Sequence, residues 1–339
     1  MSDFDSPHRQ VPAGSTRAVY SRRRFLASAG ALVGGATLMP LLARARGARL
    51  ESVEVSRPGL GTWIRIVARD PDRARAERAI ESAFAAIRRV DAEMSAFRDD
   101  SQLSAINRAA GRGGVAADAA VLDVVAMACE AAARSNGVYD PTVLPLMRLY
   151  GFYGGGDGRM PSDRAIARTL DVMGWRGVAM DRARGEIALE RAGAGLDLGS
   201  IGKGWAVDRA VDALRVAGIR SGLVDVGGNV YGLGVPEPGA QGWSVGVLHP
   251  LTRRADKVFI LRDCAVATSG NTEQFRILSG VRVGHLFDAR RGRPANGHLS
   301  ASVQAPSGVE SDVMSTAAFL LGPGGFAGWP RALAVHFIG

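Results

Sequence analysis

The residues best suited to chemistry lie in a glycine-rich stretch at 196–208, which reads L-D-L-G-S-I-G-K-G-W-A-V-D. Lys203 stands between two of its three glycines, and apolar residues then recur at helical spacing up to Gly218. A flexible loop that opens a helix brings backbone N–H groups and a positive helix end close to a ligand, and a lysine adds a full charge. This combination suits phosphate, whereas Asp197 suits a polar ligand edge or a metal.

The stretch matches neither of the common nucleotide-binding fingerprints. The Walker A motif requires Gly where Asp197 stands and a hydroxyl residue where Gly204 stands, and the spacing also differs from G-x-G-x-x-G. On local composition alone, an ordinary helix-entry loop with a surface lysine explains these residues equally well.

A second candidate site lies at 311–322, S-D-V-M-S-T-A-A-F-L-L-G. Asp312 and Thr316 are four residues apart, so they share one face of a helix. A carboxylate and a hydroxyl at the mouth of an otherwise apolar helix suit a hard cation such as Mg²⁺. The simpler interpretation is that Asp312 caps the helix and that Thr316 bonds to its own helix backbone.

Two further segments carry polar side chains next to apolar runs. Thr268 and Ser269, in A-T-S-G-N, follow a predicted strand and offer small hydroxyls and backbone donors to a cofactor. His285, in G-H-L-F-D, ends another strand-like run close in sequence to these hydroxyls. A histidine there is suited to act as a general base, although a lone histidine is often structural or solvated.

The elements that would position these residues are helices and strands without regular βαβ alternation, which indicates an α+β fold. A long helix starts at Asp70-Pro71 and extends to Met94, and two prolines exclude regular structure at 138–146. The other predicted helices are 118–134, 162–173, the segment after the 196–204 loop, and 312–321. Strands are predicted at 51–69, as a hairpin at 178–190, and at 222–226, 229–234, 243–248, 257–262, 265–268, 281–287, 300–305 and 332–338.

The N-terminus predicts export of a folded protein. Residues 21–26 read S-R-R-R-F-L, an uncharged stretch follows to Ala43, and Ala43-Arg44-Ala45 is a cleavage pattern. We therefore predict a twin-arginine signal peptide over 1–45, cleavage near Ala45, a periplasmic product, and a single domain over 50–339. An uncleaved membrane anchor is the alternative, but the glycines and Pro40 make this segment weakly hydrophobic for a permanent span.

Charge and cysteine content argue against several classes of function. Residues 1–45 contain six Arg and two Asp, so their removal lowers the net charge of this 339-residue chain from +9 to +5. That charge is modest and forms no aromatic-interleaved basic stripe, which argues against a nucleic-acid partner. Cys129 and Cys264 have no C-x-x-C spacing and no neighbouring His, so we predict two buried free thiols rather than a zinc site or a disulfide.

Taken in order, these motifs resemble the FAD:protein FMN transferase (ApbE) family over about residues 55–335. The motifs are D-L-G-S-I-G-K-G, D-V-G-G-N, A-T-S-G-N, G-H-L-F-D and S-D-V-M-S-T, preceded by G-L-G-T-W, M-S-A-F-R-D-D-S-Q-L-S-A-I-N-R and S-N-G-V-Y-D-P-T-V-L-P-L. The resemblance implies a mixed, largely antiparallel sheet core with flanking helices. It also implies Mg²⁺-dependent cleavage of FAD at its pyrophosphate, with FMN transferred to a Thr or Ser hydroxyl of another protein and AMP released.

By position, the resemblance assigns roles to individual residues. Ser200, Asp312 and Thr316 would bind the metal, Ser200 through its backbone carbonyl, and His285 would deprotonate the acceptor hydroxyl. Lys203 would contact FAD and stabilise developing charge. The other FAD contacts would be Leu60, Phe97, Val138, Tyr139, Asp140, Asp197 and Leu286.

Three departures from the family pattern keep alternatives open. Leu60 stands where Met is usual, Phe97 where Tyr is common, and Val309 where a second metal-binding Asp is often found. The last one favours one alternative, an FAD-binding carrier without transfer, and a metal-dependent FAD pyrophosphatase is a further alternative. The expected partner is a membrane-bound electron-transfer acceptor, of the type associated with nitrous oxide reduction. The chain lacks the D-x-[ST]-G-A-[ST] acceptor motif, so it should not modify itself.

Overall fold

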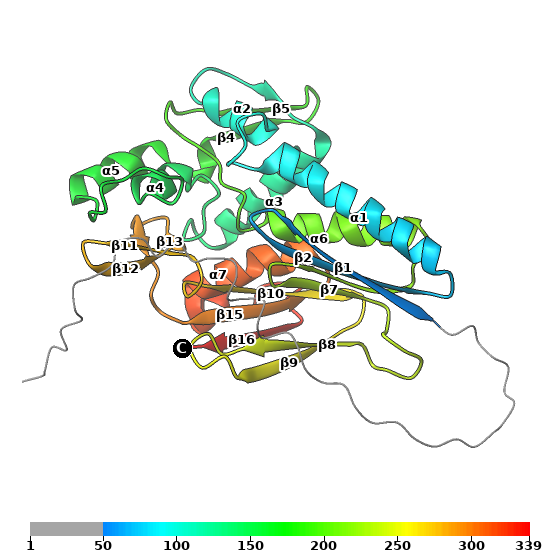
Figure 1. Cartoon of the computed structure of the whole chain (residues 1–339). Helices are drawn as coiled ribbons and strands as arrows, with labels where there is room; N and C mark the ends of the chain where they lie inside the picture. Colours follow the sequence, from blue (N-terminus) through cyan, green and yellow to red (C-terminus); the bar gives the residue numbers. More distant parts are fainter. Residues whose placement is uncertain (1–49) are drawn as a thin grey trace, which may run out of the picture. The chain divides into compact units, whose positions relative to one another are not determined.

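A computed structural model describes residues 50–339, and the predicted signal peptide at 1–45 lies outside this range (Figure 1). The described part is built on a seven-stranded sheet in which every neighbouring pair of strands is antiparallel. The predicted α+β class with a largely antiparallel sheet is therefore confirmed. In spatial order the strands are β1 (Glu51–Gly59), β2 (Thr62–Asp70), β6 (Ser221–Val226), β7 (Asn229–Leu233), β10 (Cys264–Gly270), β15 (Ser300–Ala305) and β16 (Ala334–Ile338).

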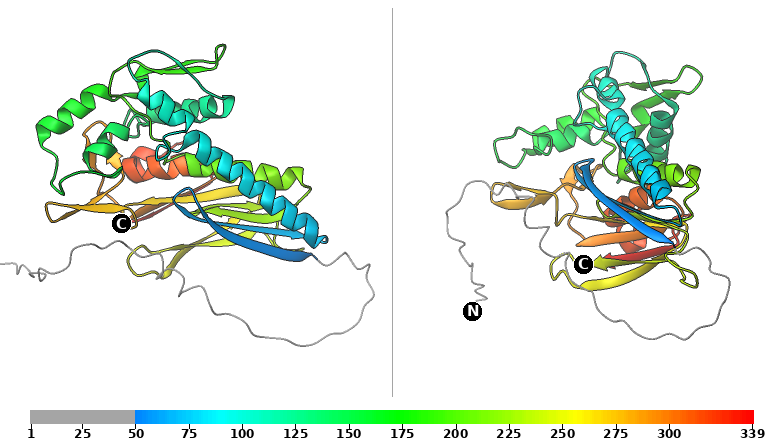
Figure 2. Two further views of the ribbon diagram at one scale, coloured as in Figure 1. Left: turned by 45° about the horizontal axis from the view of Figure 1, so that its top comes forward. Right: turned by 45° about the vertical axis from the view of Figure 1, so that its right-hand side comes forward.

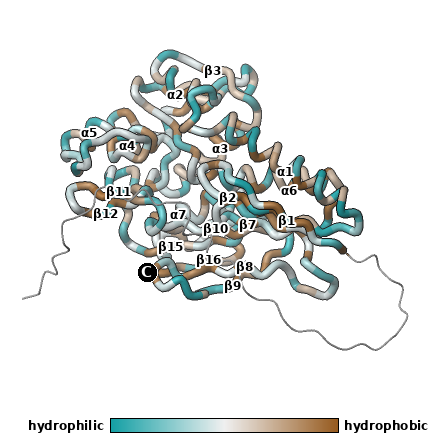
Figure 3. Tube along the Cα trace, viewed as in Figure 1, coloured by the Kyte–Doolittle hydropathy of each residue, from teal (hydrophilic) through white to brown (hydrophobic). Residues whose placement is uncertain are grey.

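Three helices cover one face of this sheet: α1 (Arg73–Met94), α6 (Gly202–Val216) and α7 (Gly308–Phe326). Helix α1 buries its apolar face against the strands. Polar and apolar residues recur along it at helical spacing, as in an amphipathic helix (Figure 3). Helix α7 is buried over most of its length because α6, β10 and β15 all pack against it. The main core lies between these helices and the sheet.

The opposite face of the sheet is covered by a separate hairpin, β8 (Trp243–Leu248) and β9 (Ala255–Leu261). Successive residues of a strand point to opposite faces, so Ile66 joins the helix-side core whereas Val67 packs with Phe259 under the hairpin. This alternation matters for the site, because only one side chain of each adjacent pair can face the helices.

The remaining elements form two groups outside the sheet and its three helices, as the two views of Figure 2 show. The first group comprises α2 (Gln102–Arg108), α3 (Ala119–Arg134) and a small sheet of β3 (Val115–Ala116), β5 (Glu186–Leu189) and β4 (Val178–Asp181). The second comprises α4 (Leu144–Leu149), α5 (Asp163–Val172) and the hairpins β11 (Phe275–Leu278) with β12 (Val281–Gly284) and β13 (Phe287–Asp288) with β14 (Arg293–Pro294). No helix within residues 50–339 is both long and apolar enough to span a membrane.

Three local predictions need correction. The proline-containing segment 138–146 is not wholly irregular, because Pro145 lies in the first turn of α4, where its missing N–H has no helical partner to lose. The predicted strand 281–287 is interrupted at His285 and Leu286, where the Asn271 side chain accepts a hydrogen bond from the Leu286 N–H. The helix predicted at 312–321 starts earlier, at Gly308. The expectation of two buried free thiols, Cys129 and Cys264, is confirmed.

Candidate active site

Helix α7 begins one turn before Asp312, and its capping residues explain why. Ser307 caps the helix by accepting a hydrogen bond from the Glu310 N–H, and its hydroxyl donates to the Glu310 carboxylate, at the residue spacing of a capping box. Asp312 therefore lies inside the helix and is not its cap. Asp312 and Thr316 share one buried helix face, and each is only 4 % exposed.

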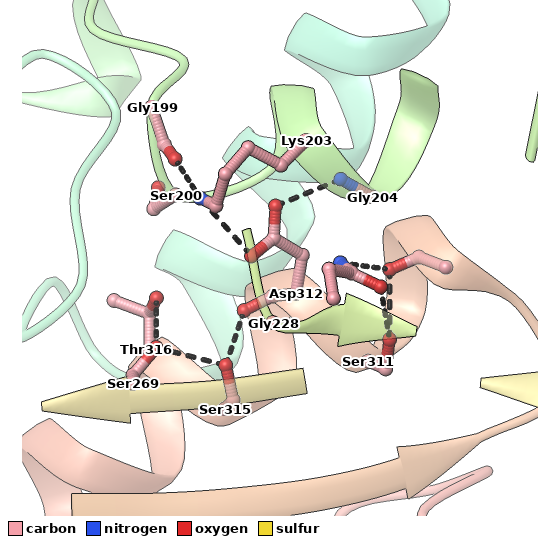
Figure 4. Close-up of polar contacts among 12 residues, drawn as sticks. Gly199, Ser200, Lys203, Gly204, Gly228, Ser269, Ser311, Asp312, Ser315 and Thr316 are labelled. Atoms are coloured by element: carbon pink, nitrogen blue, oxygen red, sulfur yellow. Dashed lines mark hydrogen bonds and ion pairs between the residues drawn. The ribbon is translucent and has the colours of Figure 1, made fainter. Parts of the chain in front are cut away.

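The Asp312 carboxylate is the centre of a polar cluster between α7 and the start of α6 (Figure 4). One oxygen accepts the Gly204 N–H at 2.9 Å, and the other lies 3.5 Å from the Lys203 ammonium. Lys203 also donates to the Gly199 carbonyl at 2.7 Å. A buried carboxylate requires such partners, and here it obtains one positive charge and one backbone donor.

A chain of hydroxyls continues from Asp312 towards β10. Ser315 donates to the Asp312 backbone carbonyl at 2.9 Å, and the Ser269 hydroxyl lies 2.8 Å from that of Ser315 and 3.0 Å from that of Thr316. Ser269, which the sequence suggested as a cofactor contact, thus lies beside Thr316, the suggested metal ligand. Its neighbour Thr268 is on the opposite face of the sheet, bonded to Ser302, and is not brought to the site.

The glycine amides of the 196–204 loop do not point at a ligand as the sequence suggested. Gly199 donates to the Asp197 carboxylate, Gly202 to the Leu198 carbonyl, and Gly204 to Asp312. Close packing explains Gly204, because a Cβ there would overlap the backbone of Gly308. The loop therefore presents the Lys203 ammonium to an anion, and its glycine amides serve the fold.

Ser200 lies in the same loop and contacts a buried aromatic residue. Its hydroxyl is 3.0 Å from that of Tyr139, whose ring is 3 % exposed. Burial raises the pKa of the Tyr139 phenol, so this group stays protonated and can donate to Ser200. Tyr139 fixes the position of the loop next to the Asp312 cluster.

The oxygen atoms around Lys203 fit a hard cation. The ammonium already bridges the Asp312 carboxylate and the Gly199 carbonyl, which shows that these oxygens face one shared position. Mg²⁺ is commonly bound by one or two carboxylates together with substrate phosphates. No second carboxylate joins Asp312 here: Val309 packs in the core, Glu310 is paired with Arg331, and residues 50–339 contain no group of three acidic, His or Cys side chains that could together hold a metal ion.

An aromatic pair stands at the other end of the loop. The Phe97 ring is 75 % exposed and stacks on Tyr153, with centroids 4.3 Å apart and planes 15° apart. The Tyr153 hydroxyl donates to the Asp197 carboxylate at 2.8 Å, and burial is the main cause that raises the pKa of this phenol. Asp197 connects Tyr153 to the start of the 196–204 loop, because its other oxygen accepts the Gly199 N–H.

His285 is a neutral imidazole with one free nitrogen. Desolvation lowers its pKa to about 4, and the positive charge of Lys203 adds to the effect. Its Nδ1 lies 3.2 Å from the Gln274 carbonyl, which can only accept, so the proton resides on Nδ1. The Nε2 lone pair is then available to take a proton, which is what a general base requires.

The other predicted FAD contacts are placed less directly. Both oxygens of Asp140 accept hydrogen bonds, one from Thr142 and one from the Trp175 N–H, so this side chain holds a neighbouring loop. Leu60 is in the β1–β2 turn with φ 50° and is partly buried against the main core. Val138 and Leu286 are both buried, at 3 % and 7 % exposure.

Comparison with known proteins decides the family. The model of the ApbE family matches residues 60–334, which is most of the chain. The chain belongs to the ApbE family.

Named relatives of this ApbE member agree in sequence and in fold. A protein of Treponema pallidum named FAD:protein FMN transferase is 33 % identical over 274 residues, covering 76 % of this chain and 75 % of its own. The crystal structure of the ApbE protein of Thermotoga maritima has a TM-score of 0.75 and 30 % identity, covering 80 % of this chain and 87 % of its own. The flavin transferase ApbE of Vibrio cholerae has a TM-score of 0.75 at 25 % identity, with coverages of 85 % and 97 %.

Three residues of the site of this ApbE member were missed from the sequence. Tyr153 lies in a glycine-rich loop without periodicity, so nothing local connected it with Phe97 or Asp197. Ser315 was overlooked because its neighbour Thr316 was the hydroxyl residue assigned to the site. Asp208 could have been found: it lies one turn after Gly204 on α6, where its side chain reaches the start of α7.

Proposed function

We propose that this chain is a periplasmic, Mg²⁺-dependent FAD:protein FMN transferase that attaches FMN to a Thr or Ser hydroxyl of an acceptor protein and releases AMP. The observation that carries the proposal is the Lys203 ammonium, held between the Gly199 carbonyl and the Asp312 carboxylate at the start of α6. Family membership and the names of the relatives support the same activity.

Phosphoryl transfer requires accurate positioning and neutralisation of charge more than covalent help. Lys203 supplies a positive charge on the side of the loop where an anion would approach. Asp312 and Thr316, with the Ser200 carbonyl, would hold Mg²⁺. Bound there, the ion would polarise the pyrophosphate and stabilise negative charge on the leaving AMP.

The chain's own base completes the reaction. The Nε2 atom of His285 accepts the proton of the acceptor hydroxyl, and that oxygen forms a bond to the phosphorus on the FMN side of the pyrophosphate. The bond from this phosphorus to the bridging oxygen breaks, and AMP leaves with the electron pair. The imidazolium then releases its proton to solvent, which restores the base. A pKa near 4 makes His285 neutral at neutral pH, so it is always ready to accept.

The N-terminal sequence supports the proposed location and partner. A twin-arginine signal with cleavage near Ala45 would deliver the folded enzyme to the periplasm. The acceptor would be a membrane-bound electron-transfer protein that exposes a flavinylation Thr or Ser on the same side of the membrane, and the type associated with nitrous oxide reduction is our preferred candidate.

The test uses the chain from residue 46, incubated with FAD, Mg²⁺ and a candidate acceptor domain, followed by mass spectrometry of the acceptor. We expect the acceptor to gain the mass of one FMN less one water, and the Asp312→Ala variant to leave it unmodified. The exposed Asp212, on the outer side of α6, provides an Asp212→Ala control that should retain full activity.

Two other outcomes would replace the proposal. Free FMN and AMP with an unmodified acceptor would identify a pyrophosphatase. FAD that stays bound and intact with several acceptors would identify a carrier. The single carboxylate of the proposed metal site, with Val309 in the core, is the observation that keeps both outcomes worth measuring.

A further inference from the structure

The N-terminal turns of α6 and α7 are joined by more hydrogen bonds than capping of α7 requires. The Asp208 carboxylate, on α6, accepts the Gly308 N–H at 2.6 Å with one oxygen and the Val309 N–H at 2.9 Å with the other. These are the first two amides of α7, which already has its own cap in Ser307. Asp208 therefore gives α7 a second cap that comes from another helix.

A second connection lies one helical turn away. The Gly204 N–H of α6 donates to Asp312 of α7, and the backbones of Gly204 and Gly308 touch so closely that neither position has room for a Cβ. Gly204 and Asp208 are four residues apart on α6, and Gly308 and Asp312 are four apart on α7. The two helices are thus tied at two successive turns.

We propose that Asp208 is a positioning residue that fixes the Asp312 carboxylate relative to Lys203 by tying the first turn of α7 to α6. Lys203 and Gly204 belong to α6, whereas Asp312 belongs to α7, so their mutual distances depend on how the two helix ends are placed. Backbone amides cannot change rotamer, so a carboxylate that holds two of them constrains the helix itself. Buried partners at Gly308 support this placement, since Asn229 and Ser311 both donate to its carbonyl.

The burial of Asp208 is consistent with this role. Desolvation raises its pKa to about 6, and the two backbone hydrogen bonds act in the opposite direction. A side chain kept in an unfavourable environment and oriented by two donors is typical of a residue that maintains a site. Arg209 and Asp212, which also influence this carboxylate, lie on the same helix.

The test compares two ways of weakening the start of α7. Asp208→Asn keeps one acceptor oxygen but replaces the other with an amide that cannot accept, so it weakens the tie to α6, whereas Ser307→Ala removes the helix's own cap and leaves the tie. Asp212→Asn is the surface control. Three quantities are measured on the chain from residue 46: hydrogen exchange at the Gly308 and Val309 amides, the dissociation constant for Mn²⁺ by electron paramagnetic resonance, and the Mg²⁺ dependence of FMN transfer.

We expect Asp208→Asn to raise the Mn²⁺ dissociation constant and the Mg²⁺ concentration for half-maximal transfer by about tenfold to a hundredfold, the usual effect of losing a residue that supports a metal ligand. Ser307→Ala should change each of these two values less than about twofold, even if it lowers the melting temperature as much as Asp208→Asn does. Equal shifts in the two variants, or unchanged Mn²⁺ binding in Asp208→Asn, would show that Asp208 only caps the helix and would overturn the inference.

The role in transfer rests on the proposed function, but the two kinds of failure are separable. If the wild-type chain modifies no acceptor, the proposed function fails. Faster exchange at Gly308 and weaker Mn²⁺ binding in Asp208→Asn would still support the positioning role. The test uses Asp208→Asn in place of Asp208→Ala because the milder change keeps the shape of the side chain and is more compatible with folding.

Discussion

One end of the candidate site, which we call the phosphate end, comprises Lys203, Gly204, Asp312 and Thr316, all of which lie on helices. Backbone groups bind the Lys203 and Asp312 side chains, and the Ser269 hydroxyl contacts that of Thr316. At the other, the aromatic end, Phe97, Tyr153 and Asp197 lie on three separate loops joined by one ring stack and one hydroxyl contact. Asp312 is 4 % exposed, whereas Phe97 is 75 % exposed. Under the proposed function, the pyrophosphate of FAD would meet the buried phosphate end and its ring system the exposed aromatic end.

The difference follows from what each end has to do. Stabilising charge in phosphoryl transfer depends on the placement of a few atoms, so small displacements are costly. Binding a ring system depends mainly on apolar area and tolerates changes of side chain. This explains how the departures from the family pattern at Leu60 and Phe97 are compatible with the site, whereas the Asp312 cluster is built on close backbone contacts.

The largest effect is expected at Asp312. Asp312→Asn keeps the shape of the side chain and an acceptor for the Gly204 N–H, but removes the charge that faces Lys203. We expect transfer to fall by about 10²-fold to 10³-fold, as for the loss of a major electrostatic contribution, while FAD binding changes far less. Single-turnover rates and FAD titration of the same samples separate the two quantities. A variant that keeps more than a tenth of the wild-type rate would mean that the phosphate end does not depend on this carboxylate.

His285 lies near enough to Lys203 to feel its charge, and it gives a prediction on pH. His285→Gln should lower transfer by about 10²-fold or more, the usual contribution of a general base. In the wild type, the acid limb caused by His285 should lie near pH 4 and not near the ordinary value of 6.5, because desolvation favours the neutral ring. A rate profile that falls with a midpoint near 6.5, and loses that limb in His285→Gln, would contradict the desolvation of this imidazole.

The same shift predicts the sign of a stability effect. The unfolded chain binds a proton at His285 below pH 6.5, whereas the folded chain does so only below about 4. Between these values the unfolded state holds more protons, so the contribution of His285 to stability decreases as the pH falls. Thermal unfolding of the wild type and His285→Gln at several pH values measures it, and the variant should lose less stability across this window.

Two glycines of one loop give a matched comparison within the phosphate end. A Cβ at Gly204 would overlap the Gly308 backbone, whereas one at Gly202 meets no atom within 4 Å. Gly204→Ala should therefore destabilise the chain by about 1–3 kcal/mol through overpacking. Gly202→Ala should be neutral or stabilise the helix by up to about 1 kcal/mol. Urea unfolding of both variants checks this, and similar values for the two would refute the close helix contact.

Much of this site could be predicted from local patterns. Helical spacing correctly placed Asp312 and Thr316 on one face, and the glycine-rich stretch correctly marked the start of α6. The use of the glycine amides could not be predicted, because the partner of the Gly204 N–H is 108 residues away. A contact between two helices that lie far apart in the sequence leaves no pattern in either segment alone.

Two errors were avoidable on physical grounds. Ser307 and Glu310 have the spacing of a capping box, which fixes the start of α7 before Asp312. Thr268 and Ser269 are neighbours on a strand, so they cannot both face the helices. By contrast, the Phe97–Tyr153 stack connects two loops without periodic structure, and only the three-dimensional arrangement reveals it.

The smallest effects are expected at the aromatic end, where two variants separate the ring from the hydroxyl. Phe97→Ala removes a ring that is mostly exposed, so it should leave the melting temperature nearly unchanged and raise the FAD dissociation constant by about threefold to tenfold, the value of one stacking contact. Tyr153→Phe keeps the stack but loses the contact to Asp197, and we expect a change below about threefold. Flavin fluorescence titration measures both constants. If Tyr153→Phe weakens FAD binding more than Phe97→Ala does, Asp197 must be held as rigidly as Asp312, and the contrast between the two ends would disappear.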